Sequence, residues 1–352
     1  MKKLILNILM LLPFAAMAQT EVTPYAPGTN AEGVTYLLPR TVLRVDIEVE
    51  TAKYTPGEYA KYADRYLRMK NDIGTEPKTT CKIQNIHLDA AGAPDTSKVY
   101  TIKLKDKTIA PMIRLNEQGI LQAINTDPKP SIPFEGYKAS KSGKVYNSRD
   151  FMTEEVLMAG STAKSAELCA QEIYAIRESK NNLNRGQADY NPTDGKQMEI
   201  MINNLNEQEA ALMQLFAGYT TYETKAYTFY VDPKEDIEKQ ILFRFSQRLG
   251  VVDNDDLSGA PVYISVKDQH TVTEPVIDEK KKKVKLEGIQ YNIPSKAAIR
   301  IFDASNKTLL QGEVSVAQFG NVETLSGALF NKKTTTKVVF YDQTGAIMKI
   351  EE

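Results

Sequence analysis

The sequence has no tryptophan, and it has only two cysteines and two histidines among 352 residues. Tryptophan is a favoured anchor at interfaces and a favoured platform for sugars and bases, so its absence lowers the case for a carbohydrate cleft, although tyrosine can replace it. His87 and His270 lie far apart, and neither sits in a known ligand spacing. The cysteines form no Cys-x-x-Cys pair. The sequence therefore predicts neither a histidine-based metal site nor a zinc ribbon.

The chain also has almost no net charge, since 44 lysines and arginines stand against 45 aspartates and glutamates. A nucleic-acid-binding protein normally carries a basic excess that neutralises phosphates. No apolar run reaches the roughly 20 residues that a membrane-spanning helix needs. We therefore expect no nucleic-acid partner and no transmembrane helix.

Motifs for catalysis are incomplete or absent. There is neither a Gly-x-Ser-x-Gly string nor a glycine-rich phosphate loop. Ser161 and Lys164 match Ser-x-x-Lys, but the accompanying Lys-Ser-Gly at 141–143 comes before it rather than after it, so we expect Ser161 to be a helix cap. The acidic string at 253–259 lacks the glycine and glutamate of a calcium loop and is expected to be a solvated turn. We assign no catalytic, metal-binding or cofactor-binding residue.

The first 18 residues have the three parts of a secretory signal peptide. Lys2 and Lys3 are followed by an apolar run from Leu4 to Phe14, and Ala16-Met17-Ala18 provides a small-x-small cleavage site before Gln19. A lipid-anchored lipoprotein would require a cysteine after the cut. We expect an exported protein in the periplasm or cell envelope, with the cell surface as an open alternative.

Export changes the interpretation of Cys81 and Cys169, because they would meet an oxidising compartment. Cys81 lies in a strand-like stretch and Cys169 on an expected helix. A disulfide between them would close a long loop and add about 4 kcal/mol of stability. The alternative is two buried free thiols that pack as small apolar groups, and the sequence leaves both possibilities open.

The fold class that the patterns predict is α+β with a majority of strands. Residues 19–125 are expected to form a β-rich domain with one helix at 55–69, because Thr55-Pro56-Gly57-Glu58 has the pattern of a capping box. The tyrosines of that helix recur on one face, which favours core packing over ligand stacking. Residues 42–49 alternate as in a half-buried strand. Turns are expected at 91–95 and 117–119.

A central helical pair should follow. Residues 126–150 contain Pro128, Pro130 and Pro133 and are expected to be a linker or mobile loop. Residues 151–218 hold two amphipathic stretches with a short polar connection, which predicts an antiparallel helical hairpin. Asp194 is the expected cap of its second helix, and Gly218 is the expected stop.

Residues 219–352 return to short strands separated by Gly, Pro, Asn and Asp, which favours a sandwich-like C-terminal part of one or more β domains. Asp342-Gln343-Thr344-Gly345 has the composition of a hairpin turn. Lysine runs at 280–283 and 332–333 flank expected strands, where lysine protects strand edges from aggregation.

Four strings carry a resemblance to a known family. They are YTPGEYAKYADRYL at 54–67, AGSTAK with ELCAQEIYAIRES within 159–179, PTDGKQM at 192–198 and QEAALMQLFAG at 208–218. Together they resemble domain-of-unknown-function family 4831, which consists of exported proteins of Gram-negative bacteria. The resemblance implies export and one continuous architecture, and it supplies no mechanism. The charged residues Arg177, Glu178 and Glu209 lie in these strings, where we expect structural ion pairs.

Two functions are compatible with these observations. The favoured one is a non-enzymatic interaction or structural module that contacts other envelope proteins. The alternative is a periplasmic hydrolase acting on glycan or peptide through a carboxylate pair, which 45 acidic residues do not single out. A deep cleft with two acids, one of raised pKa, would favour the enzyme. Exposed apolar patches would favour interaction.

Overall fold

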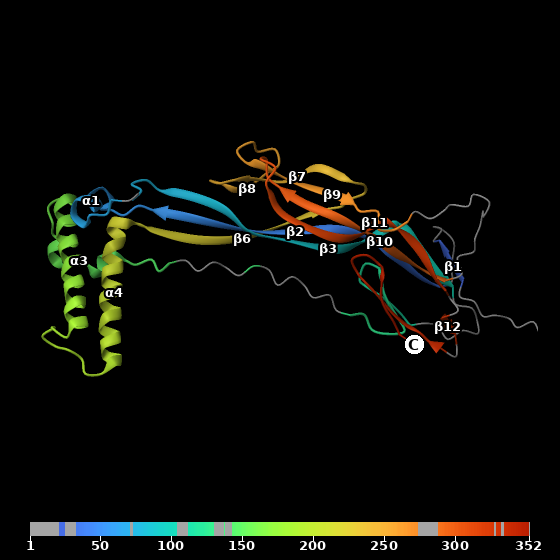
Figure 1. The fold of residues 1–352 in the computed structure, drawn as a ribbon, viewed down its shortest axis with the longest axis horizontal. Helices are drawn as coiled ribbons and strands as arrows, with labels where there is room; N and C mark the ends of the chain where they lie inside the picture. The colour runs from blue at the N-terminus through green and yellow to red at the C-terminus, as the bar shows by residue number, and fades with distance from the viewer. Residues whose placement is uncertain are drawn as a thin grey trace, which may run out of the picture.

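The computed structural model describes residues 21–24, 33–70, 73–103, 112–129, 137, 143–273, 288–326, 329–331 and 334–351. These residues are rich in strands with few helices, which confirms the predicted β-rich α+β class. The expected signal peptide, part of the expected linker and both lysine runs lie outside the described residues. The molecule is elongated, and Figure 1 shows the helices at one end of the long axis and the C-terminus toward the other.

The first sheet runs along the long axis with its strands in the order β1-β3-β2-β6, all antiparallel. Its strands are β1 (Glu21–Pro24), β2 (Val34–Thr55), β3 (Lys78–Lys103) and β6 (Tyr219–Val231). The alternation predicted for residues 42–49 is confirmed in β2. Leu43, Val45, Ile47 and Val49 are buried on one face, and Arg44, Asp46 and Glu48 occupy the other.

The turn expected at 91–95 is wrong, because this segment lies inside the continuous strand β3. Pro94 stands opposite Pro39 of β2, at an irregularity in the register. Gly92 is not a turn residue here. It lets the backbone of β3 pass close to Asp342, since a Cβ at this position would collide with the Asp342 carbonyl oxygen. The turn expected at 117–119 is confirmed, with the Gly119 amide donating to the Asn116 carbonyl at 3.0 Å.

A second sheet packs on the first and completes a sandwich. Its order is β11-β10-β9-β7-β8, and Leu43 and Ile47 of the first sheet share a core with Phe243, Ile264 and Ile299 of the second. The sandwich thus combines strands that precede the helices in the sequence with strands that follow them. The boundaries expected at 125 and 219 therefore do not separate two β units. The strands are β7 (Ile237–Ser246), β8 (Gly250–Val252), β9 (Ala260–Asp268), β10 (Gly288–Phe302) and β11 (Thr308–Ser326).

A smaller sheet lies near the C-terminus, in the order β15-β14-β5-β4. The turn expected at 342–345 joins β14 to β15, with the Gly345 amide donating to the Tyr341 carbonyl at 2.7 Å. Tyr36 of β2 shares a core with Leu121 and Val338 of this sheet, and its buried hydroxyl accepts from the backbone amide of Gln290 in β10 at 2.8 Å. The strands are β4 (Ile113–Leu115), β5 (Leu121–Ile124), β14 (Lys337–Phe340) and β15 (Ile347–Glu351), with a separate pair β12 (Phe330–Asn331) and β13 (Thr334–Thr335).

The helices gather at the end of β2 and β6 (Figure 1). The two long ones, α3 (Thr162–Arg185) and α4 (Gly195–Ala217), lie side by side and bury Ala166, Ile173, Leu212 and Phe216 in a common core. The short ones are the 3-10 turns η1 (Ala60–Tyr62) and η2 (Ser148–Phe151), and the helices α1 (Ala63–Leu67) and α2 (Glu154–Leu157). No helix in the described ranges has the length and apolar character to cross a membrane.

The caps predicted for the long helices are confirmed. Ser161 accepts from the Lys164 amide at 3.3 Å, and Asp194 accepts from the Lys196 amide at 3.2 Å. Gly218 ends α4 with a positive φ of 70°.

The helix expected at 55–69 is shorter, because helical structure covers only η1 and α1. Thr55 still belongs to β2 and pairs with Tyr219 of β6, so its backbone is committed to the sheet instead of capping a helix. The tyrosine face packs as predicted: Tyr59 is 2% exposed, and Tyr62 and Tyr66 pack against the same core.

Candidate binding site at the helical end

A pocket of about 450 Å³ lies where residues 186–194 join α3 to α4, at the end of α4 that is remote from the sheets. Gly186 sets its shape by ending α3 with a φ of 69°, so that the Gln187 amide donates to the Asn182 carbonyl at 2.8 Å. The connection then turns back between the helices. The pocket is lined by Ser179, Asn182, Leu183, Gln187, Ala188, Asp189, Tyr190, Met201, Asn204 and Leu205.

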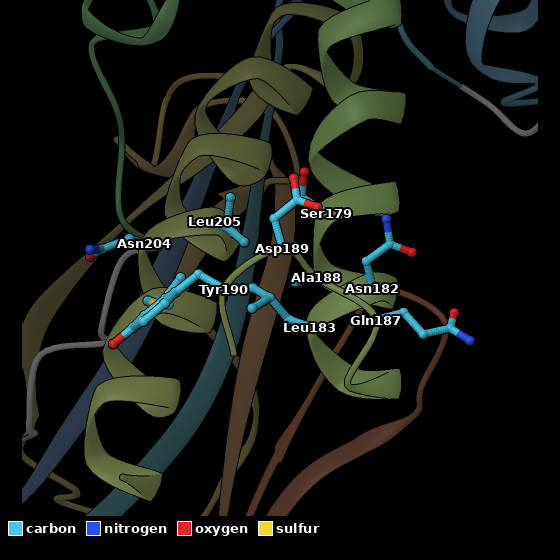
Figure 2. Close-up of a pocket in the computed structure, with 10 residues that line it drawn as sticks. Ser179, Asn182, Leu183, Gln187, Ala188, Asp189, Tyr190, Asn204 and Leu205 are labelled. Carbon is cyan, nitrogen blue, oxygen red and sulfur yellow. The ribbon is translucent and has the colours of Figure 1, made fainter. Parts of the chain in front are cut away.

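The lining combines an apolar floor with a polar rim. Leu183 is buried, and Met201 and Leu205 are half-buried. Figure 2 shows the carboxylate of Asp189 between the two helices, on the side of Ser179. The amides of Asn182 and Gln187 lie on the α3 side, whereas the Tyr190 ring and Asn204 lie on the α4 side. Such a mixture of apolar surface and a few polar groups is typical of binding pockets.

The polar side chains of the rim are free of protein partners within the described part of the chain. No hydrogen bond or ion pair engages the side chains of Ser179, Asn182, Gln187, Asp189, Tyr190 or Asn204. Asp189 is the one charged residue of the lining. The pocket therefore presents hydrogen-bonding groups and a single negative charge to whatever enters it.

A charged network beside the pocket holds the helices together. Arg177 of α3 donates from Nε to Glu209 Oε1 of α4 at 2.6 Å, and Lys180 donates to the other oxygen of the same carboxylate. Arg177 and Glu209 thus form an ion pair between the two helices, which is the structural role expected for them. Glu178 is exposed on α3 and belongs to neither the network nor the pocket lining.

Exposed apolar side chains are frequent in the helical end. Tyr190 is 65% exposed and Met158 75%, although both are large apolar groups. Such exposure is common for single residues, but several at one end of a molecule indicate a contact surface. Tyr190 lines the pocket, whereas Leu157 lines a separate hollow at the start of α3. The large apolar side chains exposed at the helical end are Leu157, Met158, Tyr174, Tyr190 and Ile200.

Two buried carboxylates occupy the outer face of β2, and both are already engaged by the protein. Asp46 is 3% exposed and accepts from Arg44 at 3.1 Å and from the Thr228 hydroxyl at 2.5 Å. Glu48 is 6% exposed and accepts from the Asn85 amide. These contacts tie β2 to its neighbours β3 and β6.

The histidines and the acidic string lie in unrelated places. His87 is in β3, and His270 follows β9, where its exposed ring contacts Asp268 at 3.1 Å. The string at 253–259 forms the turn between β8 and β9, and Asp256 accepts from the Ser258 amide at 2.8 Å. Hydrogen bonding with the Ser258 side chain, and then with the Ser258 amide, lowers the pKa of Asp256. Among the residues that the structure describes, no group of three potential ligands surrounds a metal position.

The Ser-x-x-Lys match has a structural explanation. Ser161 caps α3, and Lys164 pairs with Glu167 one turn along at 3.1 Å. Ser179 lies near the other end of the same helix, so the two serines do not face one site. Residues 141–142 of the accompanying Lys-Ser-Gly lie outside the described residues.

Cys81 and Cys169 are both free and buried. Cys81 belongs to the core of the sandwich and Cys169 to the core of the helical end. The sequence left open a disulfide or two buried free thiols, and the structure has the free thiols. Burial raises the pKa of Cys169 to about 12, and the nearby Glu172 adds to this.

The pocket itself was not foreseen from the sequence, because its residues come from three segments that only the fold brings together. One signal pointed toward it. Tyr190 is a large aromatic residue inside an otherwise polar connection between two helices, and a ring in such a place has no core to enter.

The comparisons with known proteins identify a family without naming an activity. Residues 32–348 match the family model described as Domain of unknown function (DUF4831). No match is found among curated proteins, and none among solved structures. Because the matched residues cover nearly the whole chain, including both sheets of the sandwich and the helical end, the protein belongs to this family.

Proposed function

We propose that the protein is an exported, non-enzymatic interaction module of the cell envelope. In this proposal α3 and α4 act as an antiparallel helical hairpin that the sandwich carries at one end of the molecule. The partner is another envelope protein, which docks on that end. The observation that carries the proposal is the pocket between α3 and α4, which is lined by the exposed Tyr190 and lies at the end of the molecule where further apolar side chains are exposed.

Export is part of the same proposal. The n-region, apolar run and cleavage site of residues 1–18 support it. A binding surface at one tip of an elongated molecule is well placed to reach a partner across a distance, since the sheets hold it away from the other end.

The hydrolase alternative has less support. Among the described residues, the carboxyl groups whose pKa departs from its usual value all have a lowered pKa. They are Glu209, Glu223, Asp256, Asp303 and Glu351. A general acid needs the opposite displacement. The buried acids Asp46 and Glu48 are bound to neighbouring strands rather than presented to a substrate.

Photo-crosslinking in intact cells tests the proposal. A photoreactive phenylalanine analogue replaces Ile200, which is 53% exposed at the helical end, or Leu257, which is 82% exposed in the turn before β9. We expect one discrete adduct from position 200, identified by mass spectrometry and recovered reciprocally from the tagged partner, and none from position 257. Equal labelling from both positions, or no discrete adduct, would refute the proposal.

A matched pair of tyrosine variants supplies the control. Tyr190 and Tyr230 are both 65% exposed, but only Tyr190 lines the pocket. We expect Tyr190→Ala to reduce the adduct from position 200 strongly and Tyr230→Ala to leave it unchanged. Turnover of glycan or peptide fragments by the purified protein would instead favour the hydrolase.

A further inference from the structure

The charge of the pocket is the starting point for identifying what it binds. Asp189 is the sole charged residue of the lining, and its carboxylate has no ion-pair partner within the described residues. The cations on the neighbouring turns of α3 are already used, since Arg177 and Lys180 both bind Glu209. An unpaired carboxylate next to apolar surface favours a ligand that carries both a cation and an aliphatic portion.

The shape of the pocket adds a second requirement. Its floor of Leu183, Met201 and Leu205 suits methylene groups rather than a bare ion. Figure 2 shows the side-chain amides of Asn182 and Gln187 on the outer side of α3, pointing away from Asp189, so the carboxylate is the acceptor that faces the space between the helices. An anionic ligand does not fit, since the lining contains no cation.

We propose that this pocket receives an arginine side chain of the partner polypeptide, an inference that rests on the proposed function. The aliphatic stem would lie on the leucines, and the guanidinium would donate to the Asp189 carboxylate. Arginine fits better than lysine, because its planar group can donate to both oxygens of a carboxylate at once.

The binding test uses the full chain labelled for backbone amide NMR. The probe is acetyl-arginine methylamide, and its neutral counterpart is acetyl-citrulline methylamide, which keeps the shape but loses the charge. We expect the arginine probe to shift the amide signals of Ser179, Asp189 and Tyr190 saturably and to bind about tenfold tighter than the citrulline probe. Equal binding of the two probes would overturn the assignment.

Two variants separate the pocket from general electrostatics. Asp189→Asn removes the proposed contact from an exposed connection, whereas Glu178→Gln removes the same charge from the exposed surface of α3 outside the pocket. We expect the first to lower arginine affinity to that of citrulline and the second to leave it within about twofold. If both variants act alike, or if a neutral maltooligosaccharide shifts these amides while arginine does not, the inference is wrong.

The inference and the proposed function fail in different ways. If the adduct from position 200 persists in Asp189→Asn cells and the arginine probe does not bind, the helical end recognises a protein without this arginine. If the probe binds but no adduct forms, the interaction module itself is in doubt.

Discussion

Arg177 and Glu209 form a hydrogen-bonded ion pair across α3 and α4, with 2.6 Å between Arg177 Nε and Glu209 Oε1. Lys180 binds the second oxygen, and the Glu209 side chain is only 17% exposed. We expect Glu209→Gln to lower the free energy of unfolding by about 1–2 kcal/mol, because hydrogen bonds to a charged group are lost while the half-exposed Arg177 can rehydrate. Chemical denaturation measures this. Glu223→Gln is the control, since Glu223 also has two lysine partners but is exposed to solvent; an equal effect of both variants would contradict the prediction.

The same pair predicts a pH dependence. Burial acts to raise the pKa of Glu209, but the hydrogen bonds from Lys180 and Arg177 outweigh it and hold the pKa below its usual value. A carboxyl whose pKa is lower in the folded state contributes stability above its unfolded pKa of about 4.3, and the contribution is lost as the pH falls through the folded pKa. The stability difference between the natural protein and Glu209→Gln should therefore shrink below about pH 4. A difference that is constant from pH 7 to pH 2 would show that Glu209 acts by packing alone.

Gly57 fixes how the helical end sits on the sheet. Its backbone lies against α4, where an added Cβ would collide with the Leu215 carbonyl, and that carbonyl accepts from the Tyr59 amide at 2.7 Å. We expect Gly57→Ala to destabilise the protein by about 1–3 kcal/mol through this overpacking. Gly195→Ala is the matched control, because nothing lies within 4 Å of its added methyl group. At the start of α4 it should be neutral or stabilising by up to about 1 kcal/mol. Thermal unfolding of the two variants side by side distinguishes them, and similar melting temperatures would refute the role of Gly57.

The two thiols should be unreactive until the protein unfolds. Both are buried, and the raised pKa of Cys169 keeps it protonated at pH 8. We expect iodoacetamide to modify neither cysteine rapidly in the native protein and both in denaturant, as mass spectrometry of intact protein will report. Finding a peptide that links Cys81 to Cys169 in unreduced protein from the cell envelope would contradict this.

The proposed export makes a prediction at the N-terminus. The mature protein should begin at Gln19, because cleavage follows the small residues Ala16 and Ala18. Mass spectrometry of the protein from cell fractions will locate the first residue. Replacing Ala18 with a bulky residue such as leucine should cause the uncleaved precursor to accumulate, and recovery of residues 1–18 on the mature natural protein would argue against the signal peptide.

Local signals predicted local structure well. The caps Ser161 and Asp194 are confirmed because each satisfies a backbone amide within its own first turn, and the alternation in β2 separates an apolar face from a polar one on which Asp46 and Glu48 are also buried. Long-range pairing overruled local preference elsewhere. Thr55 carries a convincing capping pattern, yet β6 arrives from more than 150 residues away and extends the strand through it.

The sandwich and the pocket also depend on contacts between segments far apart in the sequence. No local pattern states that β6 will pair with β2, so the sandwich was expected within residues 219–352 rather than across the whole chain. The pocket depends on how Gly186 directs the connection back between the helices. The polarity of Gln187 and Asp189 is equally compatible with an ordinary solvated loop, and only the fold shows that they border a cavity.

The long pairing of β2 with β6 has a mechanical consequence. If the helical end holds a partner while the opposite end is held elsewhere, tension acts along the strands. Antiparallel backbone hydrogen bonds lie perpendicular to the strands, so the thirteen paired positions from Leu43 to Thr55 would be loaded in shear. Bonds in shear break together, whereas bonds at the end of a peeled hairpin break one at a time. The long pairing of β2 with β6, which carries the helical end, would thus resist unzipping under tension.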